Sequence, residues 1–154
     1  MTTPIERCVE RWHRCVRGEL PGGLDAVLAD DVVFLSPIVF TPQRGKDVTK
    51  LYLQAAGATI GGGAPLGGTS GAPGPGGSTF RYVNEVVSGN HAVLEFETEM
   101  DGTYVNGVDM LTCDDDGRIV EFKVMIRPLK AIDLVHAQMR AMLEQMQGTA
   151  GTAR

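Results

Sequence analysis

The chain has 154 residues, of which 43% are hydrophobic and 21% charged, and its formal net charge at pH 7 is −5. These values are typical of one globular domain that buries a sizeable core, and they exclude a chain that is disordered throughout. An acidic surface without a cluster of Lys and Arg repels phosphate backbones, which excludes nucleic acid as a partner.

No segment of the sequence shows a targeting, membrane or cofactor signal. Its apolar stretches are shorter than the roughly 20 residues that a membrane helix needs, and residues 1–7 lack the basic start and apolar block of a signal peptide. The three histidines have no metal-ligand spacing, and the three cysteines form no CxxC pair. We therefore expect a cytoplasmic protein without a membrane partner, metal, cofactor or disulfide framework.

Three helices and one strand are predicted within the first 60 residues. The segment Thr3-Pro4-Ile5-Glu6 combines the spacing of a capping box with a proline at the first helical position. The apolar stripe that follows predicts one buried helix face, and because Cys8 and Cys15 lie on it, core packing explains them better than redox chemistry. A short helix over 24–29, a strand over 31–36 and a third helix over 45–58 follow.

Residues 61–78 are rich in Gly, Pro, Ser and Thr. Such a segment buries too little apolar surface to order itself, so we expect a flexible insertion between the third helix and the sheet. A lid over a binding pocket is the alternative. A phosphate-binding loop is excluded because no Lys-Ser or Lys-Thr follows the last glycine.

The second half of the chain alternates between strands and tight turns. Strands are predicted over 79–87, 91–100, 103–113 and 118–127, and Asp101-Gly102 is a strong hairpin signal. Three short turns in succession predict a four-stranded antiparallel meander. A final helix is expected over 129–147, with a disordered tail over 148–154.

The order of these elements resembles the nuclear transport factor 2-like superfamily, and within it the bacterial SnoaL-like domains. Three local segments carry the resemblance: residues 28–34, Gly45-Lys46-Asp47 and Asp116-Gly117-Arg118-Ile119-Val120-Glu121. The resemblance implies one SnoaL-like domain over 1–147 with an α+β, cystatin-like fold. In that fold a curved antiparallel sheet forms a cone, and the N-terminal helices pack on its concave face.

The ketosteroid isomerases of this superfamily provide a test for catalytic residues. Their general base precedes a proline at the end of the first strand, where this chain has Ser36, whose hydroxyl is far too weak a base. Their buried acid lies eight residues before the turn glycine, where this chain has Asp109, but their helix-1 tyrosine falls at Trp12 or Arg11. One of three positions is kept, so steroid isomerisation is not expected. Limonene epoxide hydrolase, a second relative, uses an Arg between two Asp, and that triad is absent here as well.

Strand alternation places Asp109 on the same face as Val105, Gly107 and Leu111. If this face lines the cone, burial raises the pKa of the carboxyl and makes Asp109 a candidate acid or hydrogen-bond donor. A salt bridge to Arg11 or Arg127 is the alternative. The predicted lining of the apolar pocket is Trp12, Phe34, Tyr52, Leu111, Phe122 and Val124.

Two functions remain open at this point. One is a small-molecule-binding domain whose apolar pocket holds a hydrophobic ligand without turnover, which the serine at position 36 favours. The other is a cofactor-independent isomerase, cyclase or dehydratase that uses Asp109 for proton transfer. A purely structural dimerisation module is a third, weaker possibility. We also expect a homodimer through the outer face of the sheet, where Tyr104 and Met110 would lie.

Overall fold

The computed structural model describes residues 1–59 and 80–151, with side chains described up to residue 145. The predicted insertion over 61–78 and its alternative as a lid lie outside the described residues, as do the last three residues of the predicted tail. Among the described residues, no helix is long and apolar enough to cross a membrane.

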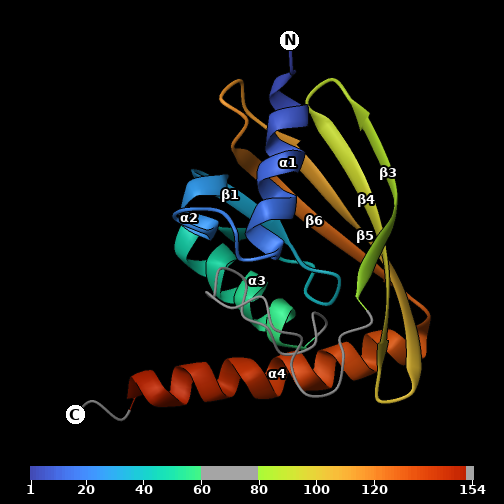
Figure 1. Ribbon diagram of the computed structural model, residues 1–154. Helices are drawn as coiled ribbons and strands as arrows, with labels where there is room; N and C mark the ends of the chain where they lie inside the picture. Colours follow the sequence, from blue (N-terminus) through green and yellow to red (C-terminus); the bar gives the residue numbers. More distant parts are fainter. Residues whose placement is uncertain (60–79, 152–154) are drawn as a thin grey trace.

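Four helices and six strands make up the described part of the chain, in an α+β arrangement. The helices are α1 (Pro4–Val16), α2 (Leu24–Val27), α3 (Lys46–Thr59) and α4 (Leu129–Gly151). The strands are β1 (Leu28–Leu35), β2 (Gln43–Arg44), β3 (Arg81–Ser88), β4 (His91–Met100), β5 (Thr103–Cys113) and β6 (Ile119–Arg127). They form one curved, open sheet, and α1 lies across its concave side while α3 and α4 lie together near one end (Figure 1).

The predicted meander is confirmed. Strands β3 to β6 pair antiparallel in sequence order, and the sheet order is β2-β1-β6-β5-β4-β3. The bounds of β4 and β5 are those predicted from the turns. β1 pairs with β6 in parallel, with Phe34 beside Phe122, so the first strand is added to the far side of the meander.

The largest differences from the prediction concern β1, β2 and α4, while the other bounds differ by at most two residues. β1 begins at Leu28, three residues earlier than predicted, and α2 is correspondingly shorter. Leu28 is fully buried beside Ile119 of β6, so its packing in the sheet outweighs its helix propensity. The two residues of β2 pair with β1 and lie between the predicted strand over 31–36 and the predicted helix over 45–58, where the sequence analysis gave no element. α4 continues past residue 147 to Gly151, since one glycine costs a helix only about 1 kcal/mol.

The core forms where α1 lies against the sheet. The capping box is confirmed, because the Thr3 hydroxyl accepts from the backbone N–H of Glu6 and the Glu6 carboxylate accepts from the N–H of Thr3, at 3.3 and 2.7 Å. The predicted stripe is buried at Ile5, Cys8, Val9, Trp12 and Cys15. This buried face orients the whole helix and points the Trp12 indole at the inner face of the sheet.

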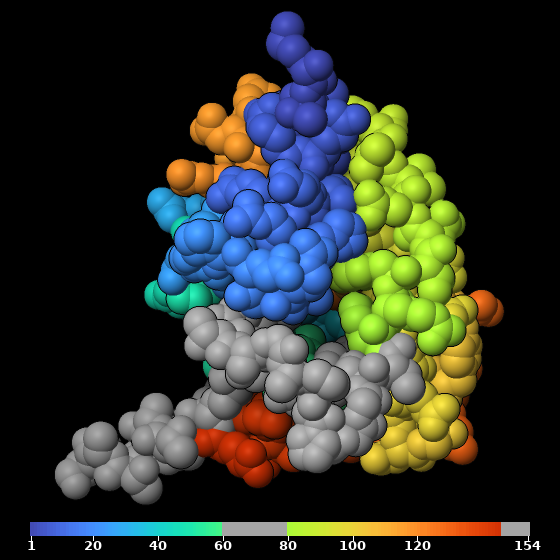
Figure 2. All heavy atoms as spheres, viewed as in Figure 1, coloured from blue at the N-terminus to red at the C-terminus, as the bar shows by residue number. Residues whose placement is uncertain are grey.

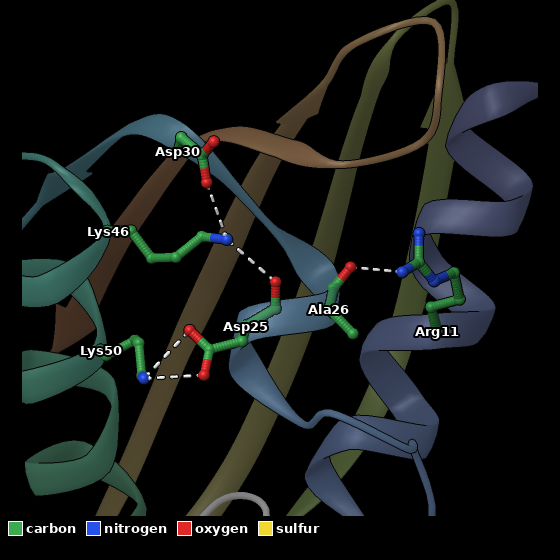
Figure 3. A network of polar contacts seen from close by, with 6 residues as sticks. All are labelled: Arg11, Asp25, Ala26, Asp30, Lys46 and Lys50. Carbon is green, nitrogen blue, oxygen red and sulfur yellow. Dashed lines mark hydrogen bonds and ion pairs between the residues drawn. The ribbon is translucent and has the colours of Figure 1, made fainter.

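A network of polar contacts holds the α2–β1 segment between α1 and α3 (Figure 3). Lys46 donates to the backbone oxygen of Asp25, Lys50 donates to both carboxylate oxygens of Asp25, and Arg11 donates to the backbone oxygen of Ala26. The ion pair between Lys50 and Asp25 contributes only about 0–1 kcal/mol. The hydrogen bonds from Lys46 and Arg11, however, satisfy two backbone carbonyls of the four-residue α2 and connect it to α3 and α1.

Candidate functional site

The residues predicted to line the pocket lie together in the structure. Trp12, Phe34, Leu111 and Phe122 are buried in one core cluster, and Tyr52 and Val124 pack against it. The ring centroids are 4.9 Å apart for Trp12 and Phe122, 6.0 Å for Phe34 and Phe122, and 5.3 Å for Phe34 and Tyr52. That these six side chains enclose a ligand cavity stays a prediction.

Asp109 lies at the centre of β5, on the inner face of the sheet. Its side chain is buried, with Leu94 of β4 and Val124 of β6 beside it in the strand ladder. The predicted alternation is correct here, because Val105, Gly107 and Leu111 are buried too.

Gly107 is needed at its position. An added Cβ would lie 2.5 Å from the Phe96 ring and 2.6 Å from the Met125 carbonyl oxygen. The absence of a side chain at Gly107 therefore lets the Phe96 ring pack across β5 on the same face as Asp109.

A chain of two hydrogen bonds ends at the Asp109 carboxylate. The Trp12 indole N–H donates to the Tyr82 hydroxyl oxygen over 2.9 Å, and the Tyr82 hydroxyl donates to Oδ2 of Asp109 over 2.6 Å. The alternative of a salt bridge is wrong, since Arg11 donates to the Ala26 carbonyl and Arg127 donates to the Asn106 side chain. The buried carboxyl thus accepts a hydrogen bond from a neutral donor, the Tyr82 hydroxyl.

This environment sets the protonation of both acidic groups. Burial raises the pKa of Asp109 from 3.8 to about 7, against the opposing effect of the Tyr82 hydrogen bond, which stabilises the carboxylate. Burial and the adjacent negative charge of Asp109 raise the pKa of Tyr82 well above 10. Near neutral pH, Asp109 therefore exchanges between acid and carboxylate, while Tyr82 stays protonated and keeps donating.

Tyr82 is a candidate functional residue that the sequence analysis did not single out. It lies on β3 at the edge of the sheet, where its ring packs edge-on against Phe80 and His13 at 5.2 and 5.3 Å. α1 and β3 lie side by side on one face of the molecule (Figure 2), which allows Trp12 to reach the Tyr82 hydroxyl. The phenol donor beside Asp109 thus comes from β3 and not from α1.

Ser36 stabilises the loop after β1. Its hydroxyl oxygen accepts from the backbone N–H groups of Ile38 and Val39, at 3.0 and 3.2 Å. Ser36 also lines a hollow of about 300 Å³ between this loop, α3 and α4, together with Tyr52 and His136. Among residues 1–59 and 80–151, no group of three His, Cys, Asp or Glu side chains could hold a metal ion.

The structure is similar to those of several bacterial proteins. A steroid delta-isomerase from Pseudomonas aeruginosa is 26% identical over 96% of this chain and 97% of its own, with a TM-score of 0.78. An uncharacterised protein with a cystatin-like fold from Silicibacter pomeroyi is 25% identical over 87% and 83%, with a TM-score of 0.70. A proposed polyketide cyclase from Sinorhizobium meliloti, 15% identical over 77% and 94%, shares the fold with a TM-score of 0.55.

Sequence comparisons alone give no relative. No protein-family model matches the chain, and no curated protein matches its sequence closely enough to count. The evidence for kinship is the combination of the curved six-stranded sheet, its helices and the structural neighbours. On that evidence, the chain belongs to the nuclear transport factor 2-like and SnoaL-like superfamily, whose members have the cystatin-like fold.

Proposed function

We propose that this SnoaL-like domain binds a hydrophobic small molecule in its interior and recognises an oxygen atom of that molecule through Asp109. The observation that carries the proposal is the buried Asp109 carboxyl, which has a phenol donor and no cationic partner among the described residues. A structural carboxylate in such a place is normally paired with a cation, because burying an unpaired charge is costly.

The neutral form of Asp109 has the hydrogen-bonding capacity that recognition needs. Oδ2 accepts the Tyr82 hydroxyl proton, and a proton on Oδ1 is then free to be donated to a carbonyl oxygen of the ligand. With a pKa of about 7, a large fraction of the protein carries this proton at neutral pH. The aromatic cluster formed by Trp12, Phe34 and Phe122 would contact the apolar body of the ligand.

A cofactor-independent isomerase, cyclase or dehydratase is the second candidate. The steroid delta-isomerase from Pseudomonas aeruginosa favours it, since that enzyme is similar over almost the whole chain. The loop after β1 argues against it. The sequence resemblance implies that Ser36 stands where those isomerases have their base, and its oxygen already accepts from two backbone N–H groups. Binding is therefore the function that the site supports better.

The experiment uses the only tryptophan of the chain as the reporter, because Trp12 contacts Tyr82 directly. Androst-4-ene-3,17-dione, an apolar ketone, should change the fluorescence of Trp12 as it binds. Asp109→Asn should keep the affinity within about threefold, since its amide also donates, and Asp109→Leu should weaken binding about tenfold. Asp116→Asn, in an exposed turn, is the matched control. Equal affinity of Asp109→Leu and the unmodified protein would rule out the proposed role of Asp109.

The same variants test the enzymatic candidate. Androst-5-ene-3,17-dione would be converted to its conjugated isomer, which absorbs more strongly in the ultraviolet. Turnover that Asp109→Asn abolishes would favour proton transfer by Asp109 over simple binding.

We also propose a homodimer that forms through the outer face of the sheet. Tyr104, Met125 and Val86 are about half exposed on this face, at 52%, 52% and 56%. No helix covers it in the described part of the chain (Figure 1). Light scattering should give twice the chain mass at micromolar concentration, and Met125→Lys should lower it to that of one chain. A monomer mass for the unmodified protein would contradict the proposal.

The cytoplasmic location expected from the sequence stays a prediction.

A further inference from the structure

The hollow between the loop after β1, α3 and α4 combines an apolar floor with a charged rim. Its apolar lining includes Ile38, Tyr52, Met139 and Leu143, and its volume is about 300 Å³. Tyr52 stacks on Phe34 at 5.3 Å, so this side of the hollow is the outer wall of the aromatic cluster. An apolar group that enters the hollow therefore meets the same cluster that faces Asp109.

The cation on the rim is only weakly neutralised. Arg140 lines the hollow, and its Nε lies 3.4 Å from the Glu144 carboxylate, one helical turn away on α4. Both side chains are about 70% exposed, at 72% and 69%, and such an exposed pair contributes only about 0.3–0.5 kcal/mol. A guanidinium prefers to bind a planar anion through two parallel hydrogen bonds, so an incoming acid can replace Glu144 at little cost.

Two further polar groups face the same space. The Ser36 hydroxyl oxygen accepts two backbone N–H groups, which leaves its single proton for another acceptor. The His136 side chain lines the hollow beside Arg140, and none of its described contacts is a hydrogen bond or an ion pair. Donors from α4 and from the loop after β1 thus line one opening.

We infer that this hollow recognises the acidic head group of an amphipathic small molecule, with Arg140 as the group that selects the negative charge. The apolar body of that molecule would lie against Tyr52 and Met139 and point towards the aromatic cluster. The inference rests on the proposed function, because the apolar body needs the interior that we propose for hydrophobic ligands. It adds the class of ligand, an aromatic or aliphatic acid.

Two fluorescent probes separate the charge from the apolar part. 8-Anilinonaphthalene-1-sulfonate and N-phenyl-1-naphthylamine share their ring system, and only the first carries an anionic group. Arg140→Gln should lower the affinity for the sulfonate about fivefold and leave the affinity for the neutral probe unchanged. Glu144→Gln should strengthen binding of the sulfonate, because Arg140 then loses its competing partner. Arg118→Gln removes the same charge from an exposed turn at the opposite end of the molecule and should change neither affinity.

Each other outcome overturns the inference in a recognisable way. If Arg140→Gln leaves the affinity for the sulfonate unchanged, or lowers the affinity for both probes equally, the hollow does not select an acid. Binding of the neutral probe would then still support the proposed function. If neither probe binds, the apolar interior is not accessible to ligands and both proposals fail. Dilution of the protein gives a further test. If it halves the mass of the protein in solution and raises its affinity for the sulfonate, a second copy of the chain occupies the hollow instead.

Discussion

Replacing Asp109 by asparagine should change how the stability of the fold depends on pH. In the unfolded chain the carboxyl ionises near 3.8, but in the folded protein burial raises its pKa to about 7. Below pH 3.8 the group is neutral in both states and has no effect on the pH dependence. As the pH rises from 3.8 to 7, the unfolded chain loses the proton and the folded protein keeps it, so unfolding becomes progressively more favourable.

The size of the effect follows from the difference between the two pKa values. A difference of about three pH units corresponds to about 4 kcal/mol, because each unit contributes about 1.36 kcal/mol. Relative to Asp109→Asn, the unmodified protein should therefore lose about 4 kcal/mol of its free energy of unfolding between pH 4 and pH 8. Any loss of packing or hydrogen bonding caused by the asparagine is independent of pH and cancels in this comparison.

Urea unfolding at a series of pH values measures this difference directly. Asp116→Asn is the matched control, since Asp116 is exposed in the turn before β6 and its curve should run parallel to that of the unmodified protein. A difference between the Asp109→Asn and unmodified proteins that stays within about 1 kcal/mol from pH 4 to pH 8 would refute the reasoning. It would mean that the carboxyl is solvated or paired in the folded state.

Three further predictions concern the core. Gly107→Ala should destabilise the fold by about 2–3 kcal/mol in urea unfolding, because its Cβ would lie 2.5 Å from Phe96; an unchanged midpoint would contradict this. Thr49→Val should stabilise it by about 1 kcal/mol, because the buried Thr49 hydroxyl has no hydrogen-bond partner among the described residues, whereas Thr49→Ser should give no gain. Burial raises the pKa of Cys8 to about 12 and of Cys15 to about 11. A maleimide at pH 7 should therefore label these two thiols only after unfolding. Labelling of both in the native protein at the rate of a free thiol would refute this.

The fold could be predicted from the sequence because its signals are local. The hairpin at Asp101-Gly102 fixes the register of β4 against β5, with Met100 beside Thr103, and that register decides which face each side chain occupies. The inward position of Asp109 follows from this register alone. The start of β1 at Leu28 was missed, because it depends on pairing with Ile119, more than 90 residues further along the chain.

The partner of Asp109 could not be predicted in the same way. Tyr82 lies on an edge strand, and the pairing of β3 with β4 shifts by one residue between Tyr82 and Asn84. Simple alternation cannot be carried across such a shift, because each displaced residue changes face. Opposite charge favoured Arg11 and Arg127 as partners, but each donates a hydrogen bond to an oxygen atom of another residue. Only the three-dimensional arrangement shows which donor lies beside the carboxyl.

The parallel pairing of β1 with β6 has a consequence for how the protein folds during synthesis. β1 has two neighbours in the sheet, and one of them is the two-residue β2. The other, β6, ends at Arg127, so β1 lacks its main partner until most of the chain has left the ribosome. Contacts between such distant segments form slowly, because a long loop must close first. We therefore expect ribosome-bound chains that stop before β6 to leave the apolar residues of β1 accessible to chaperones, and release of the last strand to complete the sheet in one step.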